Sequence, residues 1–516
     1  MLRQERLTLL AQNWLLPVAS GLLLALAYPP FRWSECGWIG LVPLLFALED
    51  GTRSQAFRRG WLAGLVFFGM TVWWTVHVTV VGTIGLVAAL ALYFGAAATL
   101  FSLLRGPDSV WRNLWVTTVG AATWVTLEWV RGKIIFGGFG WNGLGVSQYQ
   151  TLPLLQMASV TGVHGLSAVV CFVNFAIYFT FRRFLRLRND EEPTRRLSWE
   201  LYVAVALVCV VFVRGLRVMQ QDDGAAQGLR VALAQGNIPQ QVKFDPSEKP
   251  MIVQRYRSLT EKAALLNPDL IIWPETSTPG ALRYDWESYR LASNMAALAR
   301  APLLVGTMDV SGVDWFNAAA LIGPDGRISG FYHKIHLVAF GEYVPLRKIL
   351  PVMKWLTPID GSFERGDTFS IFSLGAARFG VVICFEDTLP DLYRQFIRRG
   401  ADFMVNLTND AWFKGSPAAE MHLANAVFRA VESRRPLVRC TNNGVTCVVN
   451  EFGQIKSDRR LPPHQEGLLV CSVPLTTSRG QTFYVRHGDW FVAVCALLSA
   501  VVWGMQAWSY RRRKAA

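Results

Sequence analysis

The chain has 516 residues, 52% of them hydrophobic, and a formal net charge of +14 at pH 7. It is longer than one ordinary domain and too apolar for a purely soluble protein. A charge of +14 would fit a nucleic-acid-binding protein, but the basic residues fall in clusters beside apolar stretches. This arrangement is typical of the cytoplasmic ends of membrane spans and argues against a nucleic-acid partner.

Eight stretches approach the roughly 20 mostly apolar residues that are needed to cross a bilayer. The second of them is short, and the fifth contains Glu128. The predicted spans lie near residues 11–28, 36–49, 59–81, 84–104, 114–131, 163–181, 198–215 and 488–510.

The lysine and arginine clusters predict how these spans are oriented. "RQER" precedes the first span, "RSQAFRR" follows the second, "RRFLRLRNDEEPTRR" follows the sixth, and "RRRK" closes the chain. With eight spans all four clusters face the same side, which the positive-inside rule identifies as the cytoplasm. Both termini are therefore expected in the cytoplasm, and the segment between the last two spans is expected outside.

That outer segment, residues 228–475, alternates strand-like and helix-like patterns and is long enough to bury its own core. We therefore predict three parts. Residues 1–220 form a bundle of seven spans, residues 228–475 form an extracytoplasmic α/β domain, and residues 488–510 form the last span.

Cys384 is the first candidate reactive residue of the outer domain. It follows the strand-like run Val381–Ile383 and precedes a helical pattern that ends near Gly400. At such a strand-to-helix elbow, the helix dipole would favour a thiolate, and backbone N–H groups would hold an oxyanion. A buried core cysteine is an equally good interpretation of this segment alone.

Two further candidates also stand at predicted strand ends. Glu275 follows the buried run Leu270–Trp273, where a partly desolvated carboxylate would suit a general base. Lys334 ends the second strand of a hairpin predicted over Ala319–Ile322 and 327–334, and its ammonium would stabilise an oxyanion. Alternatively, Glu275 is a glutamate of a surface loop and Lys334 is a solvated lysine at a strand end.

Together, Glu275 in "IIWPET", Lys334 in "FYHKIHL" and Cys384 in "GVVICFED" resemble the Glu-Lys-Cys set of the nitrilase superfamily. The stretches "YRSLTEKAALLNPDLIIWPE", "FNAAALIGPDGRISGFYHK", "NLTNDAWF" and "ESRRPLVRCTNNGVTCVVN" are similar as well. This resemblance covers the outer domain and implies an α-β-β-α sandwich that works through a cysteine thioester.

Within that superfamily, "LAQGNIPQ", "HLVAFGEYVPLR" and "CTNNGVT" are similar to the bacterial apolipoprotein N-acyltransferases, which carry this domain between membrane spans. The resemblance implies a multi-pass protein of the bacterial inner membrane with its catalytic domain in the periplasm. It implies a phospholipid acyl donor, by preference phosphatidylethanolamine. The acceptor would be the N-terminal amino group of the S-diacylglyceryl-cysteine of apolipoproteins. No metal or organic cofactor is implied.

The resemblance also assigns roles to residues. Glu275 would act as the base, Cys384 as the nucleophile of a ping-pong reaction, and Lys334 with the N–H of Phe385 would hold the oxyanion.

Four further positions are implied as supporting or substrate-binding residues: Glu342, Glu386, Phe244 and Trp412. Glu342 would orient the catalytic lysine, and Glu386 would be an essential carboxylate beside the nucleophile. Phe385 and Phe244 stand where well-known members have tyrosine and tryptophan, so packing against acyl chains is kept while side-chain hydrogen bonds are in doubt.

Two other functions fit parts of the sequence. A membrane-tethered carbon-nitrogen hydrolase, an amidase or nitrilase, would use the same three residues but let water resolve the thioester. A transporter or receptor with an outer sensing domain would carry charged or broken spans with internal symmetry, which this sequence lacks. Eight spans favour the acyltransferase, because a hydrolase of soluble amides needs at most one anchor.

Overall fold

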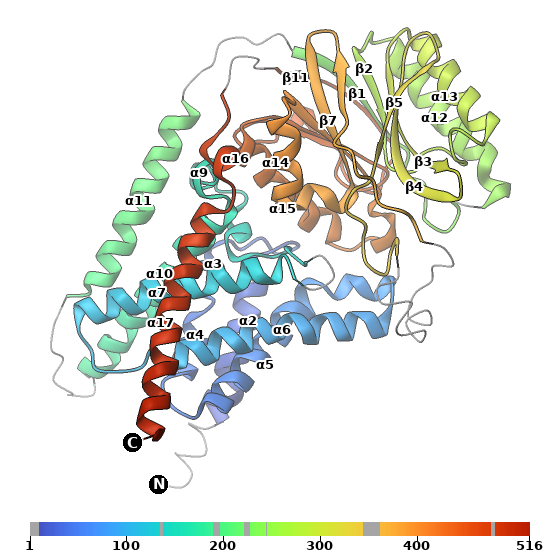
Figure 1. Cartoon of the computed structure of the whole chain (residues 1–516). Helices are drawn as coiled ribbons and strands as arrows, with labels where there is room; N and C mark the ends of the chain where they lie inside the picture. The colour runs from blue at the N-terminus through green and yellow to red at the C-terminus, as the bar shows by residue number, and fades with distance from the viewer. Residues whose placement is uncertain are drawn as a thin grey trace. The chain divides into compact units, whose positions relative to one another are not determined.

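The computed structural model describes residues 10–134, 138–188, 197–220, 228–243, 245–343, 362–475 and 480–515 (Figure 1). Its contacts divide the chain into two units. The first comprises Met1–Val76, Val80–Gln220 and His487–Ala516, and the second comprises His77–Thr79 and Gln221–Arg486.

The described part of the first unit is helical. Its α-helices are α2 (Leu16–Leu26), α3 (Glu35–Ile39), α4 (Val42–Ala47), α5 (Arg53–Thr71), α6 (Val80–Ser102), α7 (Val110–Arg131), α8 (Leu152–Leu155), α9 (Ala158–Thr161), α10 (Val163–Arg188), α11 (Trp199–Met219) and α17 (Trp490–Ala515). The π-helix η1 (Ala11–Leu15) and the 3₁₀ helices η2 (Trp73–His77) and η4 (Leu144–Gln148) complete it.

Four of these helices are long and apolar enough to cross a membrane, namely α6, α10, α11 and α17. The first two predicted spans are shorter apolar helices, Ala11–Leu26 and Glu35–Ala47. Helix α5 begins with a polar stretch, and α7 carries Glu128 and Arg131, which lowers the hydropathy of both. The described residues therefore establish membrane-type helices but not eight spans.

Small residues bring α5 and α6 close together. A Cβ added at Gly60 would lie 2.4 Å from both the Ala98 Cβ and the Phe94 carbonyl oxygen, and one at Gly64 would lie 2.8 Å from the Ala91 Cα. Close backbone approach through small residues is the usual way in which membrane helices gain packing contacts.

The second unit contains two mixed sheets. The strand order is β11-β1-β2-β3-β4-β5 in the first sheet and β10-β9-β8-β7-β6 in the second. The strands are β1 (Gly228–Gln235), β2 (Leu270–Trp273), β3 (Leu303–Ser311), β4 (Asp314–Ile322), β5 (Ile328–His333), β6 (Ile371–Leu374), β7 (Ala377–Ile383), β8 (Phe403–Thr408), β9 (Leu437–Thr441), β10 (Cys447–Val449) and β11 (Gly467–Pro474).

Helices accompany both sheets (Figure 1). The core of the first sheet includes Tyr256 of α12 (Lys249–Ala264), Met295 of α13 (Trp286–Ala299) and Trp273 of β2. Helices α14 (Pro390–Arg398) and α15 (Ala418–Ser433) belong to the half of the chain that builds the second sheet. Smaller helices are η5 (Pro246–Glu248), η7 (Cys384–Thr388), η8 (Asp410–Phe413), η9 (Ser457–Arg459) and α16 (Phe483–His487).

The two sheets meet at buried residues. Cys440 of β9 places its Sγ 3.3 Å from the Ile272 carbonyl oxygen of β2, and Thr441 places its Oγ1 3.3 Å from Gln235 Oε1 of β1. Strands β2 and β8 are buried along their whole length, as expected for parallel strands that are covered on both faces. This arrangement agrees with the predicted sandwich of two sheets.

Candidate active site

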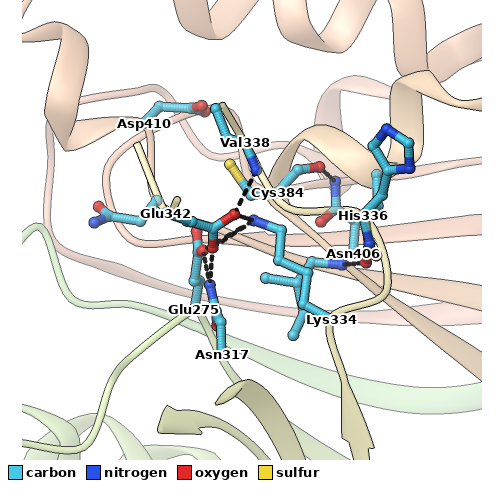
Figure 2. Close-up of polar contacts among 12 residues, drawn as sticks. Glu275, Asn317, Lys334, His336, Val338, Glu342, Cys384, Asn406 and Asp410 are labelled. Carbon is cyan, nitrogen blue, oxygen red and sulfur yellow. Dashed lines mark hydrogen bonds and ion pairs between the residues drawn. The ribbon is translucent and has the colours of Figure 1, made fainter. Parts of the chain in front are cut away.

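The three predicted reactive residues lie at strand ends that the fold brings together (Figure 2). Glu275 lies just beyond β2, Lys334 follows β5 directly, and Cys384 follows β7 directly. Lys334 Nζ is 3.8 Å from Glu275 Oε1. Both charged groups act electrostatically on the Cys384 thiol, so the three side chains belong to one site.

Lys334 is 1% exposed and is held by a second carboxylate. Its Nζ lies 2.9 Å from each carboxylate oxygen of Glu342. The N–H of Val338 donates to Glu342 Oε2 at 2.8 Å, which fixes that carboxylate. Burial alone would lower the pKa of Lys334, but Glu342 and Glu275 outweigh it and raise the pKa, so the lysine stays charged.

Asn317 links the two glutamates, and the sequence patterns did not single it out. It lies on β4 beside β5, and its Nδ2 donates to Glu275 Oε1 at 2.8 Å and to Glu342 Oε1 at 2.7 Å. The backbone N–H of Lys334 donates to the Asn317 carbonyl at 2.8 Å. One asparagine therefore sets the positions of both carboxylates and of the lysine between them.

Glu275 has the environment of a general base. Burial is the main reason that its pKa is raised, with Lys334 opposing this effect. A second lysine, Lys243, donates from Nζ to the Glu275 carbonyl oxygen at 2.7 Å. Burial lowers the pKa of Lys243 to about 8. Sequence reasoning missed Lys243, because nothing in its local pattern marks it as buried.

Cys384 occupies a strained elbow. Its φ is 55°, in the left-handed region that non-glycine residues rarely adopt, at a cost of order 1–3 kcal/mol. Its carbonyl oxygen accepts a hydrogen bond from Asn406 Nδ2 at 3.3 Å. The elbow is as predicted, although a short 3₁₀ helix, η7, follows it and α14 begins only at Pro390.

The predicted preference for a thiolate is wrong. Burial, supported by the negative charge of Glu275, raises the pKa of the Cys384 thiol to about 11, against the opposing effect of Lys334. The thiol is therefore protonated at neutral pH and needs a base to become a nucleophile.

Glu386 joins the elbow to the lysine segment. Its Oε2 accepts from the N–H of Ile383 at 2.8 Å, and its Oε1 accepts from the N–H groups of Ile335 and His336 at 2.8 Å each. The Tyr332 hydroxyl also lies 2.8 Å from Oε2. Burial raises the pKa of Glu386 to about 7 against these donors. Glu386 therefore fixes the end of β5 against the end of β7 rather than pointing freely toward a substrate.

A second buried charge cluster lies behind the elbow and was not predicted. His422 of α15 places Nε2 2.8 Å from Asp387 Oδ1 and Nδ1 3.1 Å from Asp410 Oδ1. Arg439 and Asn406 both donate to the other oxygen of Asp387. Burial would lower the pKa of His422, but Asp410 outweighs it and the pKa is raised.

One signal in the sequence points to this buried charge cluster. Arg439 stands in the middle of "LVRCT", the buried strand β9, and a charge inside such a strand must have a buried partner. The identity of that partner, 52 residues away, does not follow from the pattern.

The remaining predicted positions lie apart from this network or outside the described structure. Trp412 belongs to η8, the same turn as Asp410, and is 37% exposed. Phe385 follows the nucleophile in η7 and is partly buried. Phe244 lies outside the described residues.

Comparison with known proteins identifies both parts of the chain. Residues 20–176 match the family model of the apolipoprotein N-acyltransferase N-terminal domain, and residues 230–481 match that of carbon-nitrogen hydrolases. An amidase from Nesterenkonia sp. AN1 is similar in structure, with 17% identity and a TM-score of 0.38, over 52% of this chain and 98% of the amidase.

Curated relatives match along nearly the whole chain. The apolipoprotein N-acyltransferase of Geobacter metallireducens is 36% identical over 97% of this chain and 96% of its own length. That of Shewanella oneidensis is 30% identical over 94% of both chains. The chain therefore belongs to the apolipoprotein N-acyltransferase family, and it is an acyltransferase enzyme.

Proposed function

We propose that this enzyme transfers a fatty acyl chain from a membrane phospholipid to the N-terminal amino group of the S-diacylglyceryl-cysteine of apolipoproteins. The observation that carries the proposal is the cluster of Glu275, Lys334 and Glu342 beside a cysteine on a strained elbow. Full-length relatives named apolipoprotein N-acyltransferase support the choice of acceptor. Phosphatidylethanolamine is the proposed preferred donor.

In the first half-reaction, Glu275 takes the proton of the Cys384 thiol as the sulfur attacks the ester carbonyl of the phospholipid. Lys334 and the N–H of Phe385 stabilise the oxyanion of the tetrahedral intermediate. The carbon–oxygen bond then breaks, and Glu275 returns the proton to the departing alcohol. The products are a thioester on Cys384 and a lysophospholipid.

In the second half-reaction, the neutral amine of the apolipoprotein attacks the thioester carbonyl. Glu275 accepts a proton from the amine and delivers it to the Cys384 sulfur as the carbon–sulfur bond breaks. Because the thiol has a pKa of about 11, its sulfur leaves well only when it is protonated during this step. An amide forms, the free thiol is restored, and the reaction is ping-pong without a cofactor.

The proposed topology follows from the charge clusters. Residues 1–220 supply seven spans, residues 228–475 form the periplasmic catalytic domain, and residues 488–510 supply the eighth span in the bacterial inner membrane. Alkaline phosphatase fused after Gln220 is expected to be active, and the same reporter fused after Arg188 is expected to be inactive. Activity in the opposite pair would exclude eight spans with both termini in the cytoplasm.

The test of the reaction is the intact mass of the purified protein after incubation with phospholipid and no acceptor. The native chain is expected to gain one fatty-acyl mass that hydroxylamine removes, and Cys384→Ser is expected to gain none. Adding a diacylglyceryl-cysteine peptide should then move the acyl group to the peptide amine. Release of free fatty acid without transfer, or of ammonia from simple amides, would instead assign a carbon-nitrogen hydrolase.

A further inference from the structure

Asp410 is a buried carboxylate that the reaction proposed above does not use. It follows β8 at the start of η8, and β8 runs parallel to β7, with Leu407 opposite Ile383. Neighbouring parallel strands have their carboxyl ends at the same edge of a sheet. This register therefore brings Asp410 to the edge that carries Cys384.

The Asp410 carboxylate lies on the side of the nucleophile. In Figure 2 it extends toward the part of the site where the Cys384 sulfur lies. Burial is the main reason that the pKa of the Cys384 thiol is raised, and the negative charges of Glu275 and Asp410 add to this effect. Two carboxylates, one following a strand of each sheet, therefore act on the same sulfur.

One oxygen of Asp410 is held by the fold, and the other is not. His422 Nδ1 lies 3.1 Å from Asp410 Oδ1, and the other ring nitrogen of His422 lies 2.8 Å from Asp387 Oδ1. Asp410 is 1% exposed, yet its Oδ2 has no hydrogen-bond partner among the residues that the structure describes. A buried carboxylate oxygen without a donor is costly, so its place beside a reactive thiol indicates a bound group that completes it.

Asp387, the other carboxylate on His422, differs in this respect. His422 occupies its Oδ1, and Arg439 and Asn406 both donate to its Oδ2. The fold therefore supplies donors to both oxygens of Asp387, whereas Asp410 keeps one acceptor for a further group.

The chain makes room for that acceptor at Gly444. A Cβ added at Gly444 would collide with Asp410 Oδ2. Any other residue at this position would therefore displace the carboxylate. His422 on one side and the bare backbone of Gly444 on the other together define where Oδ2 lies.

We propose that Asp410 binds the amino group of the acyl acceptor beside Cys384, with an N–H of that group donating to Oδ2. This inference rests on the acyl transfer proposed above and assigns the position of the acceptor within it. An α-amino group has a pKa of about 7.7–8.0, so at neutral pH it arrives mostly as an ammonium, which pairs well with a carboxylate. His422 is then a positioning residue that holds Oδ1 and leaves Oδ2 to the amine.

Two acceptor carboxylates at the sulfur would also select the nucleophile. The neutral amine that attacks the thioester has two N–H groups, so one donates to Glu275, which takes that proton, and the other donates to Asp410. The alcohol of the lysophospholipid has one O–H group, and its attack would leave one carboxylate unpaired. Because an unpaired buried group is costly, Asp410 favours amide formation over return of the acyl chain to its donor.

The first test separates the two half-reactions of the full-length chain. Intact mass follows thioester formation with phosphatidylethanolamine alone, and then transfer after an S-diacylglyceryl-cysteine peptide is added. Asp410→Asn removes the charge but keeps an oxygen for His422, and it should slow transfer at least about tenfold more than it slows thioester formation. Asp387→Asn, the matched change on the other side of His422, should slow both steps by similar factors.

The second test measures binding without chemistry, in a full-length chain that carries Cys384→Ala. The acceptor peptide is compared with the same peptide lacking its α-amino group. The native Asp410 should favour the amine about tenfold or more, and Asp410→Asn should abolish most of that preference. Gly444→Ala keeps the charge of Asp410 but displaces Oδ2, so it should reduce the same preference even if Asp410→Asn does not fold.

The outcomes distinguish this inference from the proposed function. Equal slowing of both half-reactions by Asp410→Asn would overturn the role of Asp410 in holding the acceptor. An amine preference that stays at the native value in Asp410→Asn or Gly444→Ala would overturn it as well. Failure of the native chain to form a thioester would instead count against the proposed function.

Discussion

Replacing Asn317 by aspartate is expected to slow thioester formation about 100-fold or more near pH 8. The native amide donates to Glu275 at 2.8 Å and to Glu342 at 2.7 Å. Each hydrogen bond to a charged group contributes about 1.5–3 kcal/mol, so losing both removes about 3–6 kcal/mol of the free energy that holds the two glutamates in place. The new carboxylate also adds a third negative charge beside the two glutamates.

The pH dependence distinguishes this mechanism from simple misfolding. As the pH falls, the new carboxyl gains a proton and donates one hydrogen bond again, so the ratio of variant to native rates should rise. The assay is single-turnover thioester formation, followed by intact mass from about pH 5 to about pH 9. Asn450→Asp, the same change at a turn of the same unit, is the control. A loss below about threefold, or a ratio that does not change with pH, would refute the role of Asn317.

Three further predictions concern buried ionisable groups. With the pKa of Cys384 at about 11, its alkylation by iodoacetamide, read by peptide mass mapping, should accelerate about tenfold per pH unit up to about pH 10; a plateau below pH 9 would contradict this. Because burial lowers the pKa of Lys243 to about 8, the unfolded chain binds more protons above that pH. The native protein should therefore gain about 3 kcal/mol of stability between pH 8 and about 10.5, and Lys243→Met should lack this gain in denaturant unfolding. His422→Asn should destabilise the chain by about 3 kcal/mol below pH 6.5 because it breaks a buried pair. Because the pKa of His422 is raised in the folded protein, the stability lost in the variant should become smaller as the pH rises through that folded pKa. A loss of stability that grows with pH in the same unfolding assay would exclude a charged histidine.

Local patterns locate the three candidate residues because each stands at or just past the end of a predicted strand, and the strands before Glu275 and Cys384 are strongly apolar. The predicted hairpin before Lys334 is confirmed by the antiparallel pairing of β4 with β5. The buried run before Glu275 is β2, and the run before Cys384 is β7. Whether such a segment forms a strand depends mostly on residues that are adjacent in the sequence, so a single sequence is sufficient to predict these strands.

The partners of these residues depend on contacts that local patterns do not contain. Asn317 hydrogen-bonds to Glu275, which is 42 residues away in the sequence, and His422 hydrogen-bonds to Asp387, which is 35 residues away. Hydropathy has a related limit in the first unit. It predicts a span for α7 from composition, but it does not reveal that the oxygens of Glu128 are occupied by donors from α10 and from the loop after α7.

The high pKa of the Cys384 thiol has a consequence for the enzyme between turnovers. Peroxides and disulfides react with thiolates, and a thiol with a pKa of about 11 is ionised only to about one part in 10⁴ at pH 7. Protonation of the Cys384 thiol is therefore expected to slow its oxidation. If the domain lies in the periplasm, as proposed above, the same protonation would let the free thiol persist in an oxidising compartment.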